Sequence, residues 1–79
     1  MPRNFAYLVI GSDTLDQAVR HDSIRAASLA FQRVAEDLDR FDQRVEGAIH
    51  LAPSRDAIVE YPDRVLSLGP RGGLRVEST

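Results

Sequence analysis

The chain has 79 residues, a formal net charge of −2 and no cysteine. A chain of this length forms one small domain, which buries only about 60–65% of the surface that its unfolded state exposes. The near-neutral charge argues against a general nucleic-acid binder, whose surface should be clearly basic. Without cysteine, neither a disulfide nor a thiolate metal site can support the core.

All ten basic residues are arginine. This usage fits a GC-rich coding genome, and it also fits a need for guanidinium groups that bind carboxylates or phosphates in a bidentate manner. No apolar run approaches the length of a membrane span, and the apolar run at the N-terminus is too short for a signal peptide. We therefore expect a protein of the cytoplasm that does not associate with a membrane.

The first predicted element is a strand over Phe5–Ile10, where six apolar residues follow one another. Because both faces of this strand are apolar, we expect it in the centre of a sheet. Residues Gln17–Asp22 alternate in a way that favours a short edge strand returning beside the first. The spacing of Asp13 and Asp16 leaves a single helical turn as the alternative.

The clearest element is a helix over Asp22–Phe41. Either Asp22 or Ser23 can cap its first N–H groups. Its apolar residues recur at alternating steps of three and four, which places them on one stripe. These residues are Ile24, Ala27, Phe31, Val34, Leu38 and Phe41. We expect Phe31 to be the centre of the core, packed against the first strand and Ile49.

A strand over Arg44–Leu51 follows, with Val45, Gly47, Ile49 and Leu51 on one face. For Ser54–Tyr61 the sequence leaves a short helix and an irregular extended segment equally open.

The last elements form a hairpin. Val65–Leu68 and Leu74–Glu77 alternate, and the glycine-rich residues Gly69–Gly73 form the turn between them.

These elements predict an α+β domain over residues 1–79, an antiparallel sheet of four to five strands with one long α-helix packed on one face. One helix covers only one face, so apolar residues of the first strand should lie on the other. With Leu8 and Ile10 there, this open face would bind a partner or a second copy of the chain, giving a homodimer. Alternatively, Ser54–Tyr61 folds over it.

The residue patterns indicate no catalytic, cofactor or metal site. His21 and His50 are the only histidines, whereas a metal site needs three or more ligands. No serine lies in a nucleophile-elbow sequence, and the glycine-rich loop lacks the ending of a phosphate-binding loop. We therefore expect no enzyme and no bound cofactor.

Two charged groups are candidate partner-binding residues. Acidic residues gather at the end of the long helix, where they oppose the helix dipole, and such a group suits docking onto a basic partner. On the hairpin, Arg71 at the turn and Arg75 after it are presented for an acidic partner. The acidic residues are Glu36, Asp37, Asp39 and Asp42.

The order of elements resembles the small, single-helix anti-CRISPR proteins with an antiparallel sheet, which phages and mobile elements carry. The resemblance lies in the strand Phe5–Ile10, the link Ala18–Ser23 into the alanine-rich helix, and the ending Val65–Gly73. The layout and size resemble inhibitors of type I systems in particular, and the arginine usage resembles that of type I-C inhibitors. The resemblance implies a non-catalytic protein in the bacterial host that binds a Cas subunit of the crRNA-guided complex Cascade and blocks recognition of target DNA.

Two other functions stay open. A small nucleic-acid-binding module would use Arg64, Arg71 and Arg75 for phosphates and Phe5 or Tyr7 for stacking, although the net charge makes direct nucleic-acid binding the weaker hypothesis. An antitoxin-like interaction domain would self-associate through the open face of the sheet.

Overall fold

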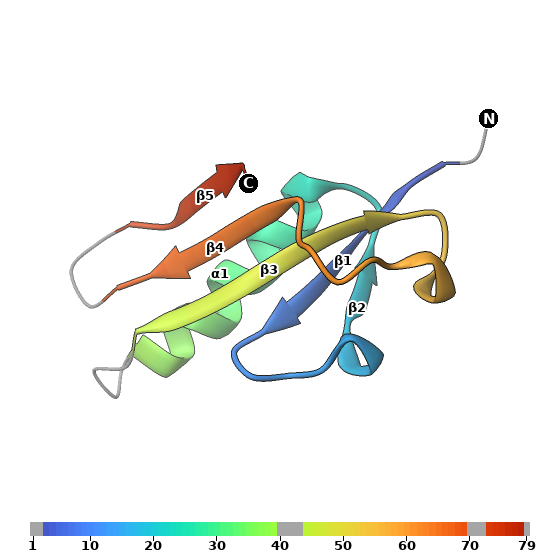
Figure 1. Ribbon diagram of the computed structural model, residues 1–79. Helices are drawn as coiled ribbons and strands as arrows, with labels where there is room; N and C mark the ends of the chain where they lie inside the picture. The colour runs from blue at the N-terminus through green and yellow to red at the C-terminus, as the bar shows by residue number, and fades with distance from the viewer. Residues whose placement is uncertain (1–2, 40–43, 70–72, 79) are drawn as a thin grey trace.

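The computed structural model describes residues 3–39, 44–69 and 73–78. Within them the chain forms a five-stranded antiparallel sheet with one α-helix on one face, which is an α+β fold as predicted (Figure 1). The regular elements are β1 (Phe5–Ile10), β2 (Val19–His21), α1 (Ile24–Asp39), β3 (Val45–Ala52), β4 (Arg64–Leu68) and β5 (Arg75–Ser78). Two short 3-10 helices, η1 (Leu15–Gln17) and η2 (Arg55–Ala57), lie in the connections.

The strands are ordered β2-β1-β3-β4-β5, and every neighbouring pair is antiparallel. The predicted central position of β1 and the predicted edge position of β2 are both confirmed. The segment before β2 also contains a helical turn, because η1 precedes the strand. The two alternatives for this stretch are therefore present one after the other.

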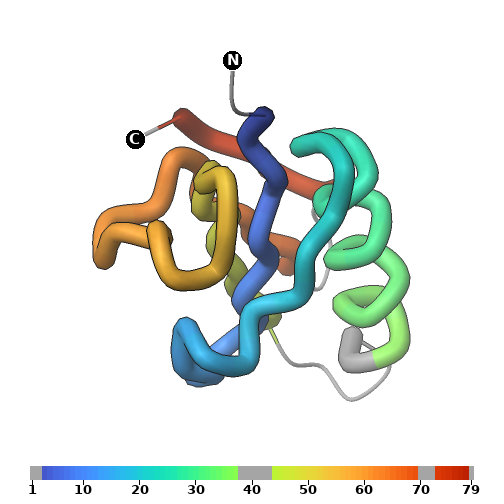
Figure 2. Tube along the Cα trace, turned by 90° about the vertical axis from the view of Figure 1, so that its right-hand side faces the viewer, coloured from blue at the N-terminus to red at the C-terminus, as the bar shows by residue number. Residues whose placement is uncertain are grey.

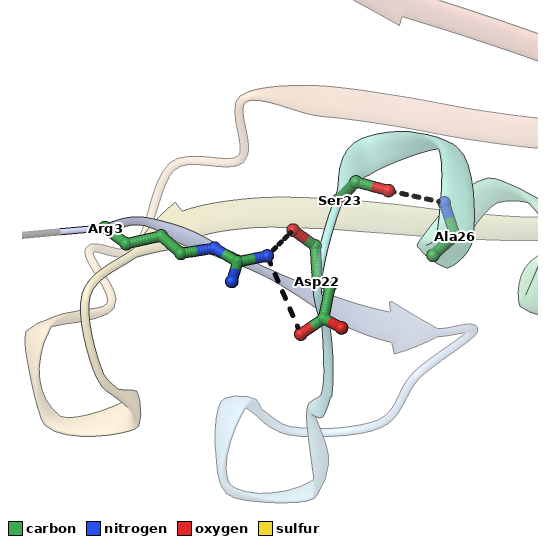
Figure 3. Close-up of polar contacts among 4 residues, drawn as sticks. All are labelled: Arg3, Asp22, Ser23 and Ala26. Atoms are coloured by element: carbon green, nitrogen blue, oxygen red, sulfur yellow. Dashed lines mark hydrogen bonds and ion pairs between the residues drawn. The ribbon is translucent and has the colours of Figure 1, made fainter.

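Ser23 caps the long helix. Its Oγ accepts a hydrogen bond from the N–H of Ala26 at 3.0 Å (Figure 3), which satisfies one of the donors left free at a helix start. Asp22 has a different role, because Arg3 contacts both its carbonyl oxygen and its carboxylate. The helix is described as far as Asp39, so the predicted end at Phe41 lies outside the described residues.

Replacing Ser23 with alanine should lower the free energy of unfolding by about 1 kcal/mol, because the N–H of Ala26 loses its acceptor. Chemical denaturation of the two proteins measures this difference. Ser12→Ala is a control, since Ser12 is exposed and precedes the first 3-10 turn. A Ser23→Ala variant as stable as the wild type would contradict the capping role.

The main core lies between α1 and the sheet. Phe31 is fully buried at its centre, together with Leu8, Ile49 and Leu66. This confirms the predicted position of Phe31. The predicted stripe is wrong at Val34, which is 41% exposed, whereas the neighbouring Ala35 is fully buried. The helix therefore presents residues 27, 31 and 35 to the sheet, a spacing of four in place of the alternating steps expected.

The second face of the sheet is covered at β1, so the expectation of an open contact surface is wrong there. Ile58, from the segment Ser54–Tyr61 that the alternative placed over this face, packs on β1, whereas Val65 of β4 is 39% exposed. Leu8 and Ile10 point toward α1 and belong to the main core. The opposite face of β1 carries Tyr7 and Val9, which are buried in a second cluster. Residues packed there include Ala18, Ala52, Leu15 and Ile58. Figure 2 shows α1 on one side of the sheet and the connection from β3 to β4 on the other.

Arg55 holds this cover in place. Its guanidinium donates to the carbonyl oxygens of Ala18 at 2.6 Å and Asp16 at 3.1 Å, and it lies 5.7 Å from the centre of the Tyr7 ring. One side chain thus joins the connection after β3 to the connection before β2. The two connections together cover the second face of β1.

Residues 54–61 form one turn of 3-10 helix and then continue without regular structure. Ser54 precedes the turn, but its side chain makes no capping hydrogen bond. After the turn, the Val59 carbonyl accepts a hydrogen bond from His50 Nδ1 at 3.0 Å. The Asp63 carboxylate accepts one from the N–H of Leu51 at 2.7 Å. These bonds attach the irregular segment to β3.

The predicted hairpin is confirmed as β4 and β5, which pair from Arg64 opposite Ser78 to Ser67 opposite Arg75. Residues 70–72 of its turn lie outside the described residues. Of the described glycines, only Gly11 has a positive φ, at 63°.

Candidate protein-binding surface

The acidic group at the end of α1 lies on an exposed part of the helix. Glu36 and Asp37 are both exposed, and Asp39 is the last residue of α1. The Glu36 carboxylate accepts a hydrogen bond from Gln32 Nε2 one turn earlier at 3.0 Å, which orients it along the helix. Asp42, the fourth predicted acidic residue, lies outside the described residues.

The electrostatic position of this group is unfavourable for the isolated helix. The last turn of α1 contains no basic residue, and the helix dipole places partial negative charge at the same end. Arg44, which follows in the sequence, has its Nε 3.8 Å from Oε1 of Glu46 of β3. The acidic end of α1, defined as the exposed residues Glu36 and Asp37, therefore carries negative charge at the negative end of the helix dipole.

Among the described residues of the two predicted docking groups, Arg75 lies on the face of the sheet opposite α1, which carries Glu36 and Asp37. Arg75 is exposed on β5 and pairs with Ser67, which in turn pairs with Glu46. The adjacent positions Gly47 and Leu66 face α1. Because side chains alternate along a strand, Arg75 faces away from the helix. Arg71, the other predicted arginine, lies outside the described residues.

The histidines do not form a site. His21 belongs to the edge strand β2, whereas His50 belongs to β3 and is 4% exposed. Since a carbonyl oxygen only accepts, the contact with Val59 requires that Nδ1 of His50 carries the proton. Among the residues that the structure describes, no three histidine or acidic side chains gather in a way that could hold a metal ion.

The aromatic residues considered for base stacking are not available. Tyr7 is 4% exposed beneath Arg55. The Phe5 ring is half-buried and has Arg3 and Arg20 over it, at 5.2 Å and 4.9 Å from the ring centre. The face that would have received a base is thus already occupied by side chains of the protein.

Sequence reasoning missed one exposed apolar pair. Tyr61 is 79% exposed and Val59 is 63% exposed, both in the irregular segment before β4. No periodic pattern marks them, because an irregular segment has no regular alternation of buried and exposed residues. Their exposure follows from the inward anchoring of Ile58 and of the Val59 carbonyl.

No protein-family model matches this sequence, and comparisons with curated proteins and with solved structures give no significant match. In the described part of the chain, no helix is both long and apolar enough to cross a membrane.

Proposed function

We propose that this protein is a non-catalytic anti-CRISPR inhibitor, which binds a Cas subunit of the type I Cascade complex and blocks recognition of target DNA. Its docking surface is the acidic end of α1. The observation that carries the proposal is the exposure of Glu36 and Asp37 on a helix end whose last turn has no basic residue. The choice of Cascade as the partner rests on the resemblance in size and element order.

The physical basis is charge mimicry. A complex that binds DNA presents grooves rich in lysine and arginine, and these grooves attract negative charge over distances set by the ionic strength. An acidic helix end offers carboxylates on a rigid support, with part of the helix dipole added to their charge. It can therefore occupy such a groove in place of a DNA backbone.

Two features of the structure weaken the alternatives. A nucleic-acid-binding module was expected to stack bases on Tyr7 or Phe5, but Tyr7 is buried and Arg3 and Arg20 lie over the Phe5 ring, which leaves Tyr61 as the exposed aromatic residue of the described chain. An antitoxin-like domain that associates through the face of β1 opposite α1 needs that face to be uncovered, whereas Leu15, Ala18 and Ile58 pack on it.

Reversing two acidic charges tests the proposal. Asp37→Arg together with Asp39→Arg should slow association with purified Cascade by about tenfold or more at low salt, because attraction between opposite charges acts mainly on the association rate. The difference should shrink between about 0.03 M and about 0.3 M salt, over which the screening length falls roughly threefold. Surface plasmon resonance and an assay of target-DNA binding by Cascade give the two readouts.

The matched control is Asp13→Arg with Asp56→Arg, which makes the same change in net charge at exposed positions away from α1. It should bind Cascade nearly as well as the wild type. Full inhibition by the Asp37/Asp39 variant would refute docking through α1, and a wild-type protein that fails to bind Cascade would refute the inhibitor function. Salt-dependent binding to DNA that is lost with Arg64→Glu and Arg75→Glu would favour the nucleic-acid-binding module.

A further inference from the structure

The hydrogen bonds of the sheet determine which backbone groups reach its free edges. The N–H of Gly11 donates to the carbonyl of Glu46 at 2.8 Å, so the even-numbered residues of β3 bond toward β1. The odd-numbered residues of β3 then bond toward β4. Two hydrogen bonds support this direction: the carbonyl of Ile49 accepts from the N–H of Asp63, and the N–H of Leu51 donates to the Asp63 carboxylate. Since bonded and non-bonded pairs alternate in an antiparallel ladder, the same alternation extends to every strand.

On β5, Arg75 and Glu77 pair with Ser67 and Val65 of β4. By this alternation, the backbone N–H and C=O groups of Arg75 and Glu77 point toward β4. The N–H and C=O groups of Val76 therefore point away from the sheet, at the edge shown in Figure 1. Within the described residues, no hydrogen bond engages them. Val76 is also 42% exposed, and all four residues of β5 are exposed.

The opposite edge of the sheet is protected. On β2 the outward-facing backbone groups belong to Ala18, Arg20 and Asp22, by the same alternation. The carbonyl of Ala18 accepts from Arg55, and the carbonyl of Asp22 accepts from Arg3 (Figure 3). Arginine side chains thus occupy both ends of the β2 edge, which is one way in which proteins prevent edge-to-edge pairing. The described residues show no such protection at β5.

The side chains of β5 are complementary to those of a second β5. In an antiparallel pair with Val76 opposite the Val76 of a second copy, Arg75 lies opposite Glu77 and Glu77 lies opposite Arg75. Both pairs are of the non-hydrogen-bonded kind, whose Cα atoms are about 4.5 Å apart, so the opposite charges are adjacent. A shift by two residues in either direction would place Arg75 opposite Arg75 or Glu77 opposite Glu77. A shift by one would remove the hydrogen bonds.

We propose that two copies of this chain associate through their β5 edges in this register, which joins their sheets into one and places both α1 helices on the same face. The two Val76 residues make reciprocal backbone hydrogen bonds, and two Arg75–Glu77 ion pairs select the register. This association does not depend on the proposed inhibitor function, because the acidic end of α1 and Cascade take no part in it.

The dimer is expected to be weak. One four-residue strand buries far less than the roughly 1,200 Å² of a stable interface, so the dissociation constant should be micromolar or higher. Salt should weaken the dimer further, because both ion pairs are exposed to solvent. Sedimentation velocity of the full chain at about 0.05 M salt, from micromolar to millimolar protein, should show a concentration-dependent shift from monomer to dimer.

Hydrogen exchange identifies the edge that is used. The amide protons of Arg75 and Glu77 point into the sheet and should be protected at every protein concentration. The amide proton of Val76 should exchange rapidly in dilute solution and become protected as the dimer forms. A dimer that leaves Val76 unprotected would contradict the proposal, and so would a strict monomer at millimolar concentration.

Charge exchange tests the register. Arg75→Glu alone and Glu77→Arg alone each place like charges opposite one another, so each variant should stay monomeric where the wild type dimerises. An equimolar mixture of the two variants should form a heterodimer, because every Glu then faces an Arg. Val76→Pro removes the outward N–H without breaking the ladder to β4 and should abolish dimerisation. Circular dichroism checks that each variant is folded. Failure of the mixture to associate would overturn the register.

Discussion

Replacing Phe31 with alanine is expected to lower the free energy of unfolding by about 3–5 kcal/mol, a large part of the 5–15 kcal/mol typical of a small domain. Phe31 is fully buried between α1 and the sheet, in the same cluster as Leu8, Ile49 and Leu66. Removing its ring leaves a cavity that atoms of a continuous sheet cannot readily fill. Thermal and chemical denaturation followed by circular dichroism measure the loss.

Leu29→Ala provides the matched control, because it truncates an apolar side chain of the same helix that is 49% exposed. Its effect should be well under half that of Phe31→Ala. A Phe31→Ala variant that melts at the wild-type temperature would contradict the position of the ring in the core, and with it the orientation of α1 on the sheet.

Replacing Gly47 with alanine is expected to have the next largest effect, a destabilisation of about 1–3 kcal/mol from overpacking. A Cβ at this position would lie 2.7 Å and 2.8 Å from Cε1 and Cδ1 of Phe31, and 3.1 Å from the carbonyl oxygen of Val9. The ring is enclosed by the core, so it cannot move away without displacing other side chains. Because Gly47 has no side chain, the ring of Phe31 can pack directly against β3 at this position.

The cause of the Gly47→Ala effect can be isolated with a double-mutant cycle in the Phe31→Leu background, which removes the ring atoms nearest to the new methyl group. Gly47→Ala should cost at least about 0.5 kcal/mol less in that background, since residues in contact are not additive. Gly69→Ala is the control, because a Cβ there meets no atom of the described residues within 4 Å. Equal costs in both backgrounds would show that the ring is not the obstacle.

Much of the candidate site follows from position along the chain. Glu36 and Asp37 fall on the polar side of the helix by simple periodicity, and the structure finds both exposed. The face of Arg75 was not predictable in the same way, because it depends on the pairing of β5 with β4 and on which side of the sheet α1 covers. The free edge at Val76 likewise depends on hydrogen-bond alternation carried across the sheet from Gly11.

Local patterns in the sequence were sufficient to predict the helix and the strands. The apolar run Phe5–Ile10, the alternation after Arg44 and the helical spacing between Ile24 and Phe31 each reflect which residues of one segment share a face. Ser23 marks the start of the helix because its oxygen bonds an amide only three residues away. Contacts between residues so close in the sequence depend on local residue patterns, so those patterns predict them.

Only the tertiary structure decided the rest. Val34 and Ala35 are both compatible with the apolar stripe, and the close approach of the helix to the sheet selects the smaller side chain for burial. The second face of β1 is closed by Arg55, which bonds carbonyl groups 37 and 39 residues away. Contacts of this kind join segments that are far apart in the sequence and have no periodic relation to each other. The local sequence of either segment therefore does not predict them.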